Sequence, residues 1–353
     1  MRAAALRAGR IYVNEDVPEP QPAFGQVLVQ VKACGICGSD LHFVQHGPEM
    51  IDLGKQMKGV PSLTGMGGDD SSADELDFDR DIYMGHEFSA EVLEVGPDTD
   101  APGPGTLVTS LPVLLTASGI RPIVYSNDVL GGYGERMLLS AGMLAEVPNG
   151  LDAGHAALTE PMAVGLHAVN KSKIAAGDGA LVLGCGPVGL ACIAALRLQG
   201  VDTIVATDFS PARRAIATQM GATEVVDPAS EDAFDAWSRA GRGKSLVVFE
   251  AIGVPGIIDT VLRDAPMGTR VLVVGVCMGQ DTITPFFAIS KELNIQFALA
   301  YDLMEFHQSL RAIAEGDIDV TPLITGEVPL DGVADAFAAL ADPDEHCKIL
   351  VTP

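Results

Sequence analysis

Three side chains able to bind a transition metal, Cys37, His86 and Glu160, lie in the first half of the sequence. A catalytic zinc ion takes three protein ligands and keeps one position open, and a mixture of thiolate, imidazole and carboxylate donors suits it. Each residue also has an ordinary alternative, because cysteines are often buried, histidines often pair on the surface, and glutamates are usually solvated. The spacing of the three residues leaves both interpretations open.

Cys34 forms a C-x-x-C pair with Cys37. Structural zinc sites use this spacing, but they need four ligands, and no second cysteine pair follows in this sequence. We therefore expect Cys34 to be a small, buried, apolar residue rather than a ligand.

A glycine-rich turn lies farther along the chain, between a predicted strand and a predicted helix. Its residues, which we expect at a cofactor, are Gly184, Gly186, Pro187, Val188 and Gly189. In a G-x-G-x-x-G turn the first glycine permits the tight bend, the second lets the backbone approach a pyrophosphate, and the third lets the helix pack closely on the strand. The helix N-terminus adds the positive end of its dipole. The pattern also occurs in turns without a ligand, but its place between strand and helix predicts a dinucleotide site.

Asp208 ends the next predicted strand, and its carboxylate can accept hydrogen bonds from the adenosine ribose hydroxyls. Because the same carboxylate repels a 2′-phosphate, the sequence predicts NAD rather than NADP. Arg213 and Arg214 follow closely, and either could bind a phosphate. We place Arg213 among the cofactor-binding residues and keep NADP as the alternative.

The two candidate sites lie in parts of the chain with different patterns. Over residues 165–299, apolar strands alternate with helical stretches, as in ALVLGCG followed by PVGLACIAALRLQG, which predicts a doubly wound parallel sheet. Residues 1–164 are β-rich, and segments such as QVLVQVKAC and SAEVLEVG alternate apolar and polar residues like half-buried antiparallel strands. The tail, residues 300–353, is too short for a domain, so we expect it to join residues 1–164. The predicted fold class is therefore α/β, with a discontinuous first domain.

The composition excludes some classes of partner. The net charge is −25, with 48% hydrophobic and 20% charged residues, so the surface repels nucleic-acid phosphates and anionic membranes. Residues 179–196 carry no charge, but their glycines and proline favour a buried strand, turn and helix over a membrane span. No signal-peptide pattern is visible at the start, and the six cysteines lack the spacing of a disulfide scaffold. These features predict a cytoplasmic protein without a nucleic-acid or membrane partner.

Several motifs together resemble the zinc-dependent medium-chain dehydrogenase/reductase family, in its alcohol, sorbitol, butanediol and threonine dehydrogenase branch. They are GICGSDLH, GHE, GGYGERMLL, EPMAVGLHAV, GCGPVG and the C-terminal KIL, and they span nearly the whole chain. The resemblance implies a Rossmann dinucleotide-binding domain and a discontinuous, GroES-like catalytic domain.

The resemblance also implies roles for the residues at the metal. Cys37 and His86 would bind the catalytic zinc, with Glu160 as the third ligand of the sorbitol-type branch, where the alcohol-type branch carries cysteine. Glu87 would lie near the metal and exchange with its water. Asp40 would orient the histidine ligand, as zinc-bound imidazoles usually require.

Further roles follow from the same resemblance. Ser39 and His42 would form the proton relay. Val188 would pack behind the nicotinamide ring, and Lys348 would meet the pyrophosphate of the cofactor.

Two segments depart from the family pattern. Residues 103–128 contain no cysteine where many relatives carry a four-cysteine lobe, so we expect one catalytic zinc ion per chain and no structural zinc. Residues 47–84 form an insertion between Cys37 and His86. The insertion is either a tolerated surface loop, since long loops cost little entropy, or partly a wall of the substrate cleft.

The function implied by the resemblance is that of an NAD-dependent zinc alcohol dehydrogenase. Zinc would polarise the oxygen of a secondary alcohol, diol or polyol, and the proton would leave through Ser39, the cofactor ribose and His42 toward solvent. A hydride would pass to the nicotinamide. One alternative is a zinc-free, NADPH-dependent quinone or enoyl reductase of the same fold, which would lack the cysteine, GHE and EP residues. Another is a dinucleotide-binding protein without catalysis, which would need neither Cys37 nor Ser39. No motif in the sequence identifies the substrate.

Family practice predicts a homodimer or homotetramer. The segment RVLVVGVC, residues 270–277, is the candidate strand for edge-to-edge pairing of two dinucleotide domains.

Overall fold

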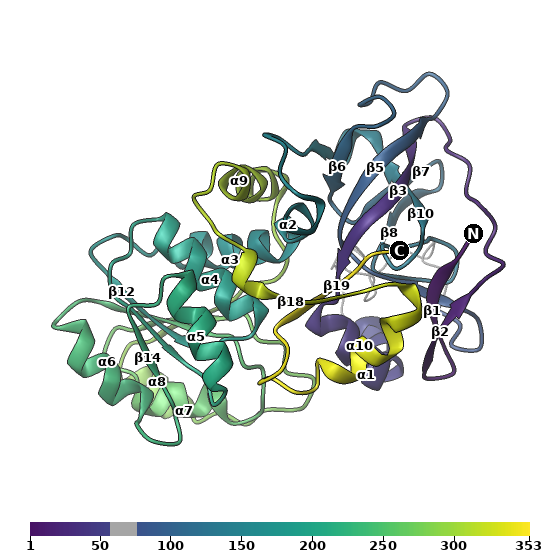
Figure 1. Cartoon of the computed structure of the whole chain (residues 1–353). Helices are drawn as coiled ribbons and strands as arrows, with labels where there is room; N and C mark the ends of the chain where they lie inside the picture. The colour runs from purple at the N-terminus through teal and green to yellow at the C-terminus, as the bar shows by residue number, and fades with distance from the viewer. Residues whose placement is uncertain (57–75) are drawn as a thin grey trace. The chain divides into compact units, whose positions relative to one another are not determined.

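The computed structural model describes residues 1–56 and 76–353, and its contacts divide the chain into two compact units (Figure 1). The first unit contains Met1–Glu160, Ile324–Ala341 and Lys348–Pro353. The second contains Pro161–Leu323 and Asp342–Cys347.

The first unit is built on mostly antiparallel sheets. A seven-stranded sheet has the order β11-β6-β5-β3-β19-β18, with β10 also paired to β3. Its strands are β3 (Gln26–Gly35), β5 (Glu87–Val95), β6 (Leu107–Ser110), β10 (Arg136–Ser140), β11 (Leu144–Glu146), β18 (Ile324–Val328) and β19 (Lys348–Val351). The two alternating segments of the sequence are β3 and β5, which pair with each other in the middle of this sheet.

Smaller elements complete the first unit. A four-stranded sheet has the order β2-β1-β4-β9, and β7 pairs with β8. These strands are β1 (Ala3–Arg7), β2 (Arg10–Asn14), β4 (Ile82–Met84), β7 (Val113–Thr116), β8 (Gly119–Pro122) and β9 (Tyr125–Ser126). The helices are α1 (Gly38–Gln56), α2 (Ala153–Ala157) and α10 (Val333–Ala339), and α3 (Thr159–Ser172) begins in this unit.

The end of the chain returns to the first unit, but later than residue 300. Strand β19 pairs antiparallel with β3 and parallel with β18. Helix α9 (Leu303–Ala314) instead belongs to the second unit, where Glu305 accepts hydrogen bonds from His167 and Asn170 of α3. We therefore assign residues 300–323, expected in the first domain, to the second unit.

The second unit contains a six-stranded parallel sheet in the order β14-β13-β12-β15-β16-β17. Numbered along the unit, this order is 3-2-1-4-5-6, which is typical of dinucleotide-binding sheets. The strands are β12 (Gly179–Leu183), β13 (Ile204–Thr207), β14 (Glu224–Val226), β15 (Leu246–Glu250), β16 (Arg270–Val273) and β17 (Asn294–Phe297). The connecting helices are α4 (Pro187–Leu198), α5 (Pro211–Met220), α6 (Ala233–Gly241), α7 (Ile257–Asp264) and α8 (Pro285–Ser290). The predicted doubly wound sheet is confirmed.

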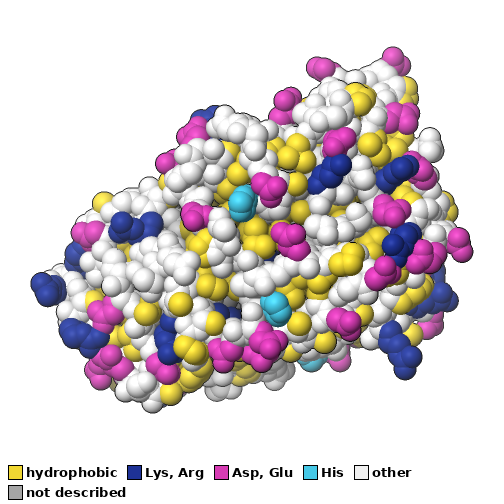
Figure 2. Space-filling model, viewed as in Figure 1, with side chains coloured by type: hydrophobic (Ala, Val, Ile, Leu, Met, Phe, Trp, Pro, Cys, Tyr) yellow, Lys and Arg dark blue, Asp and Glu magenta, His cyan; other side chains and the backbone are white. Residues whose placement is uncertain are grey.

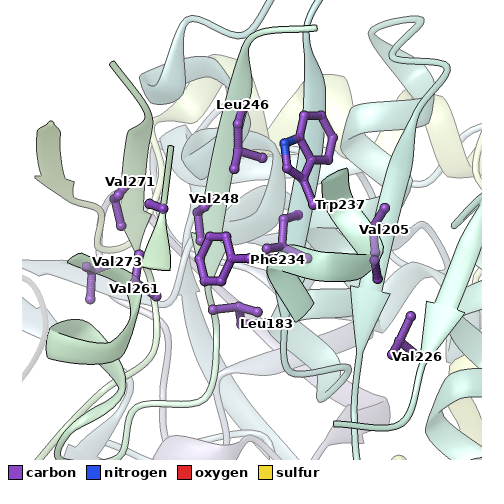
Figure 3. Packing of buried hydrophobic residues seen from close by; sticks show 13 residues of the cluster. Leu183, Val205, Val226, Phe234, Trp237, Leu246, Val248, Val261, Val271 and Val273 are labelled. Carbon is purple, nitrogen blue, oxygen red and sulfur yellow. The ribbon is translucent and has the colours of Figure 1, made fainter. Parts of the chain in front are cut away.

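The core of this sheet explains the uniformly apolar strands. All five residues of β12 and of β15 are buried, because helices shield parallel strands from water on both faces. On one face, Phe234 and Trp237 of α6 pack against strand residues such as Leu183 and Val248 (Figure 3). The strand predicted to pair between subunits, residues 270–277, is β16, and it lies between β15 and β17. That prediction is wrong, because both edges of β16 are already paired, and the edge strand is β17.

Two parts of the insertion are described, residues 47–56 and residues 76–84. The first continues α1, which has non-helical backbone angles at His46 and contains Pro48, a residue that disrupts the preceding helical turn. The second returns through Phe78, whose carbonyl accepts a hydrogen bond from the Ala8 amide at 3.1 Å, and enters β4. Residues 57–75, the rest of the insertion, lie outside the described residues.

The surface charge and the length of the helices relate to the prediction that the protein has no nucleic-acid or membrane partner. Acidic side chains are spread over the face shown in Figure 2, in keeping with the net charge of −25. Within the ranges that the structure describes, no helix is both long enough and apolar enough to span a bilayer.

Candidate metal centre and dinucleotide turn

The loop between β3 and α1 positions Cys37. The Ile36 amide donates to the Ile349 carbonyl at 3.0 Å, which fixes the end of β3 against β19. The Cys37 amide then donates to Asp40 Oδ2 at 3.2 Å, and the Asp40 amide donates to the Cys37 carbonyl at 3.1 Å. These reciprocal bonds hold Cys37 at the start of α1.

The turn between β4 and β5 positions His86 and Glu87. It contains Gly85, whose φ of +100° is a conformation that L side chains rarely adopt. A Cβ at Gly85 would lie 2.8 Å from the Tyr133 amide nitrogen, so the close approach of this loop also requires glycine. His86 and Glu87 are therefore presented next to the Cys37 loop by local backbone geometry.

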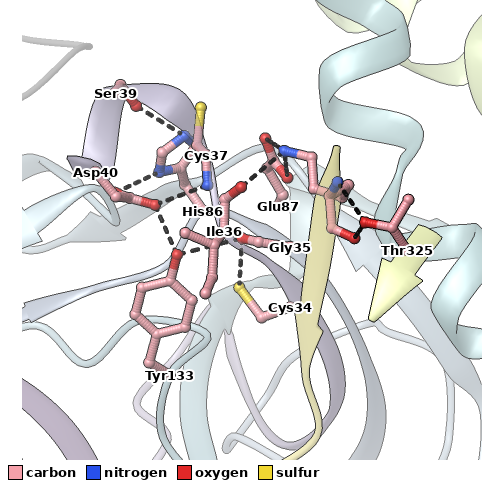
Figure 4. Close-up of polar contacts among 11 residues, drawn as sticks. Cys34, Gly35, Ile36, Cys37, Ser39, Asp40, His86, Glu87, Tyr133 and Thr325 are labelled. Carbon is pink, nitrogen blue, oxygen red and sulfur yellow. Dashed lines mark hydrogen bonds and ion pairs between the residues drawn. The ribbon is translucent and has the colours of Figure 1, made fainter. Parts of the chain in front are cut away.

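Cys37, His86 and Glu87 form a group whose potential ligand atoms all lie within 4.8 Å of one another (Figure 4). A sulfur, an imidazole nitrogen and a carboxylate oxygen at this separation are a donor set that suits zinc. His86 and Glu87 are buried, with exposed fractions of 6% and 1%. The residues present thus fit the metal ion that the resemblance implies.

The orientation of the His86 ring supports the same conclusion. Its Nδ1 faces Asp40 Oδ1 at 3.6 Å, and both atoms are buried without a hydrogen bond to any described residue. Its Nε2 lies 3.5 Å from the Ser39 hydroxyl, on the side of the ring where Figure 4 shows the Cys37 sulfur. Nε2 is therefore the nitrogen available to a metal, and Asp40 is placed to orient the ring from the other side.

Negative groups surround the imidazole. Burial lowers the pKa of His86, but Asp40, Cys37 and Glu160 raise it, and the net pKa lies well above its usual value. Burial raises the pKa of Asp40, against the opposing effects of His86 and the Tyr133 hydroxyl, which donates to Asp40 Oδ2 at 2.6 Å. This environment favours positive charge at the imidazole, and a divalent cation on Nε2 would supply it.

Glu160, the predicted third ligand, lies in the first turn of α3 and raises the pKa of His86, so its carboxylate is near the ring. It does not belong to the group formed by Cys37, His86 and Glu87. The geometry of the described residues thus adds Glu87 as a candidate third ligand beside Glu160.

Lys348 is placed differently from the prediction. Its ammonium donates to both carboxylate oxygens of Glu87, at 2.6 and 2.7 Å, and to the Ile36 carbonyl at 2.9 Å. The side chains of the pair are 0% and 1% exposed. The predicted contact with a pyrophosphate does not match this arrangement, because the ammonium is fully buried and all its donors are used. We assign Lys348 to Glu87 instead.

The two relay residues lie on α1. Ser39 lies beside His86, as described above, whereas the His42 side chain lies one turn farther along the helix and is exposed. Partial burial lowers the pKa of His42, and the neighbouring His46 lowers it further. A neutral imidazole near the surface is suited to accept a proton from the site.

Tyr133 is a site residue that the residue types alone did not reveal. Besides bonding to Asp40, it follows Gly132, where an added Cβ would lie 2.5 Å from the buried Cys34 sulfur. Cys34 is buried and outside the donor group, as a structural cysteine would be. The motif GGYGERM contains Tyr133, but nothing in its spacing indicates which acid the phenol meets.

The glycine-rich turn has the geometry expected of a dinucleotide site. Gly184 follows β12 with a φ of +91°, and a Cβ on Gly189 would lie 2.0 Å from the Gly184 carbonyl oxygen. A Cβ on Gly186 would meet nothing within 4 Å, so the backbone there is open to a ligand. Pro187 and Val188 begin α4, and the helix N-terminus thus points its amides at the turn.

Asp208 lies at the carboxyl end of β13 and is tied to the same turn. Its carboxylate accepts hydrogen bonds from the Cys185 amide at 2.8 Å and from the Ser210 amide at 2.9 Å. Arg214 donates to the carbonyls of Asp208 and Phe209. Arg213, in contrast, has a buried Nε without a hydrogen-bond partner, so it is the better placed of the two arginines to bind a ligand.

Comparisons with known proteins agree with both halves of the chain. The family described as alcohol dehydrogenase GroES-like domain matches residues 23–149, and the family described as zinc-binding dehydrogenase matches residues 187–315. The predicted GroES-like fold of the first domain is thereby confirmed.

Full-length relatives give the same picture. The chain is 33% identical to the (R,R)-butanediol dehydrogenase of Bacillus subtilis over 100% of both chains, and 27% identical to a sorbitol dehydrogenase of that organism over 100% of this chain and 97% of the relative. The crystal structure of 2R,3R-butanediol dehydrogenase from Bacillus subtilis superposes with a TM-score of 0.83, at 31% identity over 100% of this chain and 99% of that one. A zinc-binding dehydrogenase structure from Sinorhizobium meliloti, bound to NADP, has a TM-score of 0.81 at 27% identity over 100% of this chain and 99% of that one.

Proposed function

Because the chain belongs to the zinc-dependent medium-chain dehydrogenase/reductase family and is an oxidoreductase of its zinc alcohol dehydrogenase type, we propose that it transfers a hydride between a secondary alcohol, diol or polyol and NAD at one zinc ion. The observation that carries the proposal is the group of Cys37, His86 and Glu87, with ligand atoms within 4.8 Å. A zinc-free quinone or enoyl reductase would not need this group.

Residues of the first unit have three proposed roles at the site: metal binding, orientation of the His86 ring, and proton transfer. Cys37, His86 and Glu87 would hold zinc, which when bound would act as a Lewis acid and lower the pKa of a substrate hydroxyl. Asp40 keeps the His86 ring in its orientation. Ser39, beside His86, would accept the hydroxyl proton while releasing its own toward the cofactor ribose, His42 and solvent.

The second unit would hold the dinucleotide, whose nicotinamide would supply the hydride acceptor when bound. The open backbone at Gly186 and the amides at the start of α4 would bind the pyrophosphate, while Asp208 and Arg213 would meet the adenosine ribose. We propose NAD rather than NADP because of the carboxylate at Asp208.

A substrate panel tests the proposed function. Purified protein loaded with zinc should form NADH from at least one of a set of vicinal diols, sugar alcohols, cyclic alcohols and aromatic alcohols, and a chelator should remove that activity. Zinc-free protein that reduces quinones or enones with NADPH, and is unaffected by chelation, would establish the alternative reductase.

Zinc content distinguishes Glu87 from Glu160 as the third ligand. We expect Glu87→Gln to weaken zinc binding about 10- to 100-fold or more, because a neutral amide is a much poorer zinc ligand than a carboxylate. Glu160→Gln should retain zinc, measured by metal analysis and by competition with a chromophoric chelator. If Glu160→Gln loses zinc while Glu87→Gln retains it, the ligand set predicted from the sequence was right and the geometric assignment is wrong.

The cofactor preference depends on the Asp208 charge. Asp208→Asn keeps an acceptor for the Cys185 and Ser210 amides but removes the charge that repels a 2′-phosphate. We expect the preference for NADH over NADPH, measured as a ratio of Kd values by fluorescence titration, to fall about tenfold or more. Adding Arg213→Ala should weaken NADPH binding again. Wild-type protein that binds NADPH more tightly than NADH would refute the role of Asp208.

We also propose a homodimer in the cytoplasm. Exposed apolar side chains lie on α8 and on β17: Phe286 and Ile289 of α8 are 71% and 75% exposed, and Phe297 of β17 is 64% exposed. One edge of β17 has no partner strand among the described residues, and such an edge favours pairing with a second copy, which light scattering would detect as twice the monomer mass. The cysteine pattern suits a reducing compartment.

A further inference from the structure

A buried tyrosine outside the predicted site, Tyr125, has a hydroxyl without a hydrogen bond to any residue that the structure describes. Tyr125 lies in the short strand β9, and its side chain is only 4% exposed. Buried polar atoms nearly always have a hydrogen-bond partner, because without one the free energy lost on removing the atom from water is not offset. An orphaned hydroxyl at this depth therefore points to a group that is absent from the structure.

The position of this phenol relates it to the proposed metal centre. Strand β9 pairs with β4, so Tyr125 lies opposite Met84, two residues before His86. Burial raises the pKa of the phenol well above its usual value, Asp40 and Cys37 raise it further, and a side-chain interaction with the Ser39 hydroxyl, outside hydrogen-bond geometry, lowers it. The Tyr125 ring stacks on Phe43, which lies one turn after Ser39 in α1, so the phenol lies near Ser39.

An aromatic stack holds the phenol in place. The Tyr125 ring lies parallel to the Phe43 ring of α1, with centroids 3.8 Å apart and an interplanar angle of 6°. Phe43 in turn stacks on Phe78 at 6.0 Å. A Cβ on Gly47 would lie 2.9 Å from the Phe78 ring, so α1 and the returning end of the insertion meet closely here. Because stacking fixes the orientation of the Tyr125 ring, the direction of its C–O bond is fixed as well.

We propose that the Tyr125 hydroxyl binds a second hydroxyl of the substrate, on the carbon next to the carbinol carbon, and so selects vicinal diols over simple secondary alcohols. The inference rests on the proposed function, in which the first hydroxyl lies at Cys37 and His86. A vicinal diol then carries its second hydroxyl to the neighbourhood of the phenol. A simple alcohol leaves the buried phenol unpaired, and sites built to bond a hydroxyl discriminate strongly against substrates that lack it.

Tyr125→Phe tests this role, since it removes the hydroxyl and keeps the stacked ring. We expect the ratio of kcat/KM for 2,3-butanediol to kcat/KM for 2-butanol to fall about tenfold. Tyr83→Phe is the matched control, because Tyr83 lies on the adjacent strand β4 opposite Ser126 and outside the proposed site. That control should leave the ratio at its wild-type value. An unchanged ratio in Tyr125→Phe overturns the proposal.

Two further measurements separate this proposal from the proposed function. If zinc-loaded wild-type protein oxidises no alcohol, the proposed function fails, and calorimetric binding of 2,3-butanediol and 2-butanol to the zinc- and NADH-loaded protein still tests the phenol. Tighter binding of the diol that Tyr125→Phe abolishes supports the proposal, and equal binding overturns it. Thermal unfolding tests for a structural role, because removal of an unpaired hydroxyl should leave the Tm unchanged or higher. A Tm several degrees lower would reveal a partner within the protein and overturn the proposal.

Discussion

Replacing Cys37 with serine is expected to release the zinc ion and to lower kcat/KM about a thousandfold. The thiolate is the softest of the three proposed donors, and a serine hydroxyl stays protonated and binds zinc poorly. A Lewis acid stabilises the developing alkoxide by several kcal/mol, and each 1.36 kcal/mol of barrier is a factor of about ten in rate. Metal analysis after dialysis and steady-state kinetics with added zinc would measure the two losses.

Cys34→Ala provides the matched control for this experiment. Cys34 belongs to the same C-x-x-C pair, but its sulfur is fully buried, lies 3.7 Å from the Gly35 carbonyl oxygen and is outside the donor group. We expect this variant to retain zinc and activity. The assignment of the metal centre is refuted if Cys34→Ala loses the metal and Cys37→Ser keeps it.

Lys348→Met is expected to lower the free energy of unfolding by about 3–5 kcal/mol. The ammonium neutralises Glu87 in a site where neither side chain is more than 1% exposed. Without Lys348, a buried carboxylate remains with no countercharge, and the Ile36 carbonyl also loses its donor. Urea unfolding in the presence of a chelator would measure the loss without a contribution from metal binding.

A second change distinguishes the charge effect from general damage to packing. Glu87→Gln/Lys348→Met removes both charges, so we expect it to recover more than half of the stability lost in Lys348→Met. Lys32→Met is the control for a surface pair, since Lys32 and Glu91 are 2.9 Å apart but 32% and 35% exposed. Its cost should stay below about 1 kcal/mol. A double variant as unstable as Lys348→Met would show that the pair does not act through its charge.

The dinucleotide half of the protein was predictable from sequence because its signals are local. Gly184, Gly186 and Gly189 lie within six consecutive residues, between a strand and a helix that their neighbours specify. The backbone angle at Gly184 and the contact between Gly189 and the Gly184 carbonyl depend on this short segment. The apolar strands also reveal a sheet covered on both faces, whatever the rest of the chain does.

The edges of this half were less predictable. The pattern did not distinguish β16 from β17 as the edge strand, because both carry apolar residues and only the pairing order separates them. Helix α9 was placed with the wrong unit, since its amphipathic face does not reveal which surface will cover it. Its contacts through Glu305 with His167 and Asn170 join residues more than 130 positions apart.

The metal centre was partly predictable from the sequence. Residue types and the family resemblance predicted Cys37, His86, Asp40 and Ser39, all carried by two short motifs, and the structure brings these residues together. The pairing of Glu87 with Lys348 came from the folded chain, because it depends on strands distant in sequence that meet in one sheet, as β3, β5 and β19 do. The unpaired hydroxyl of Tyr125 also came from the folded chain, because it depends on the pairing of β9 with β4 and on the stack with Phe43 of α1. Charge and hydrogen bonding act over a few ångströms in space, so the partner of a buried group is set by which strands become neighbours and not by spacing along the chain.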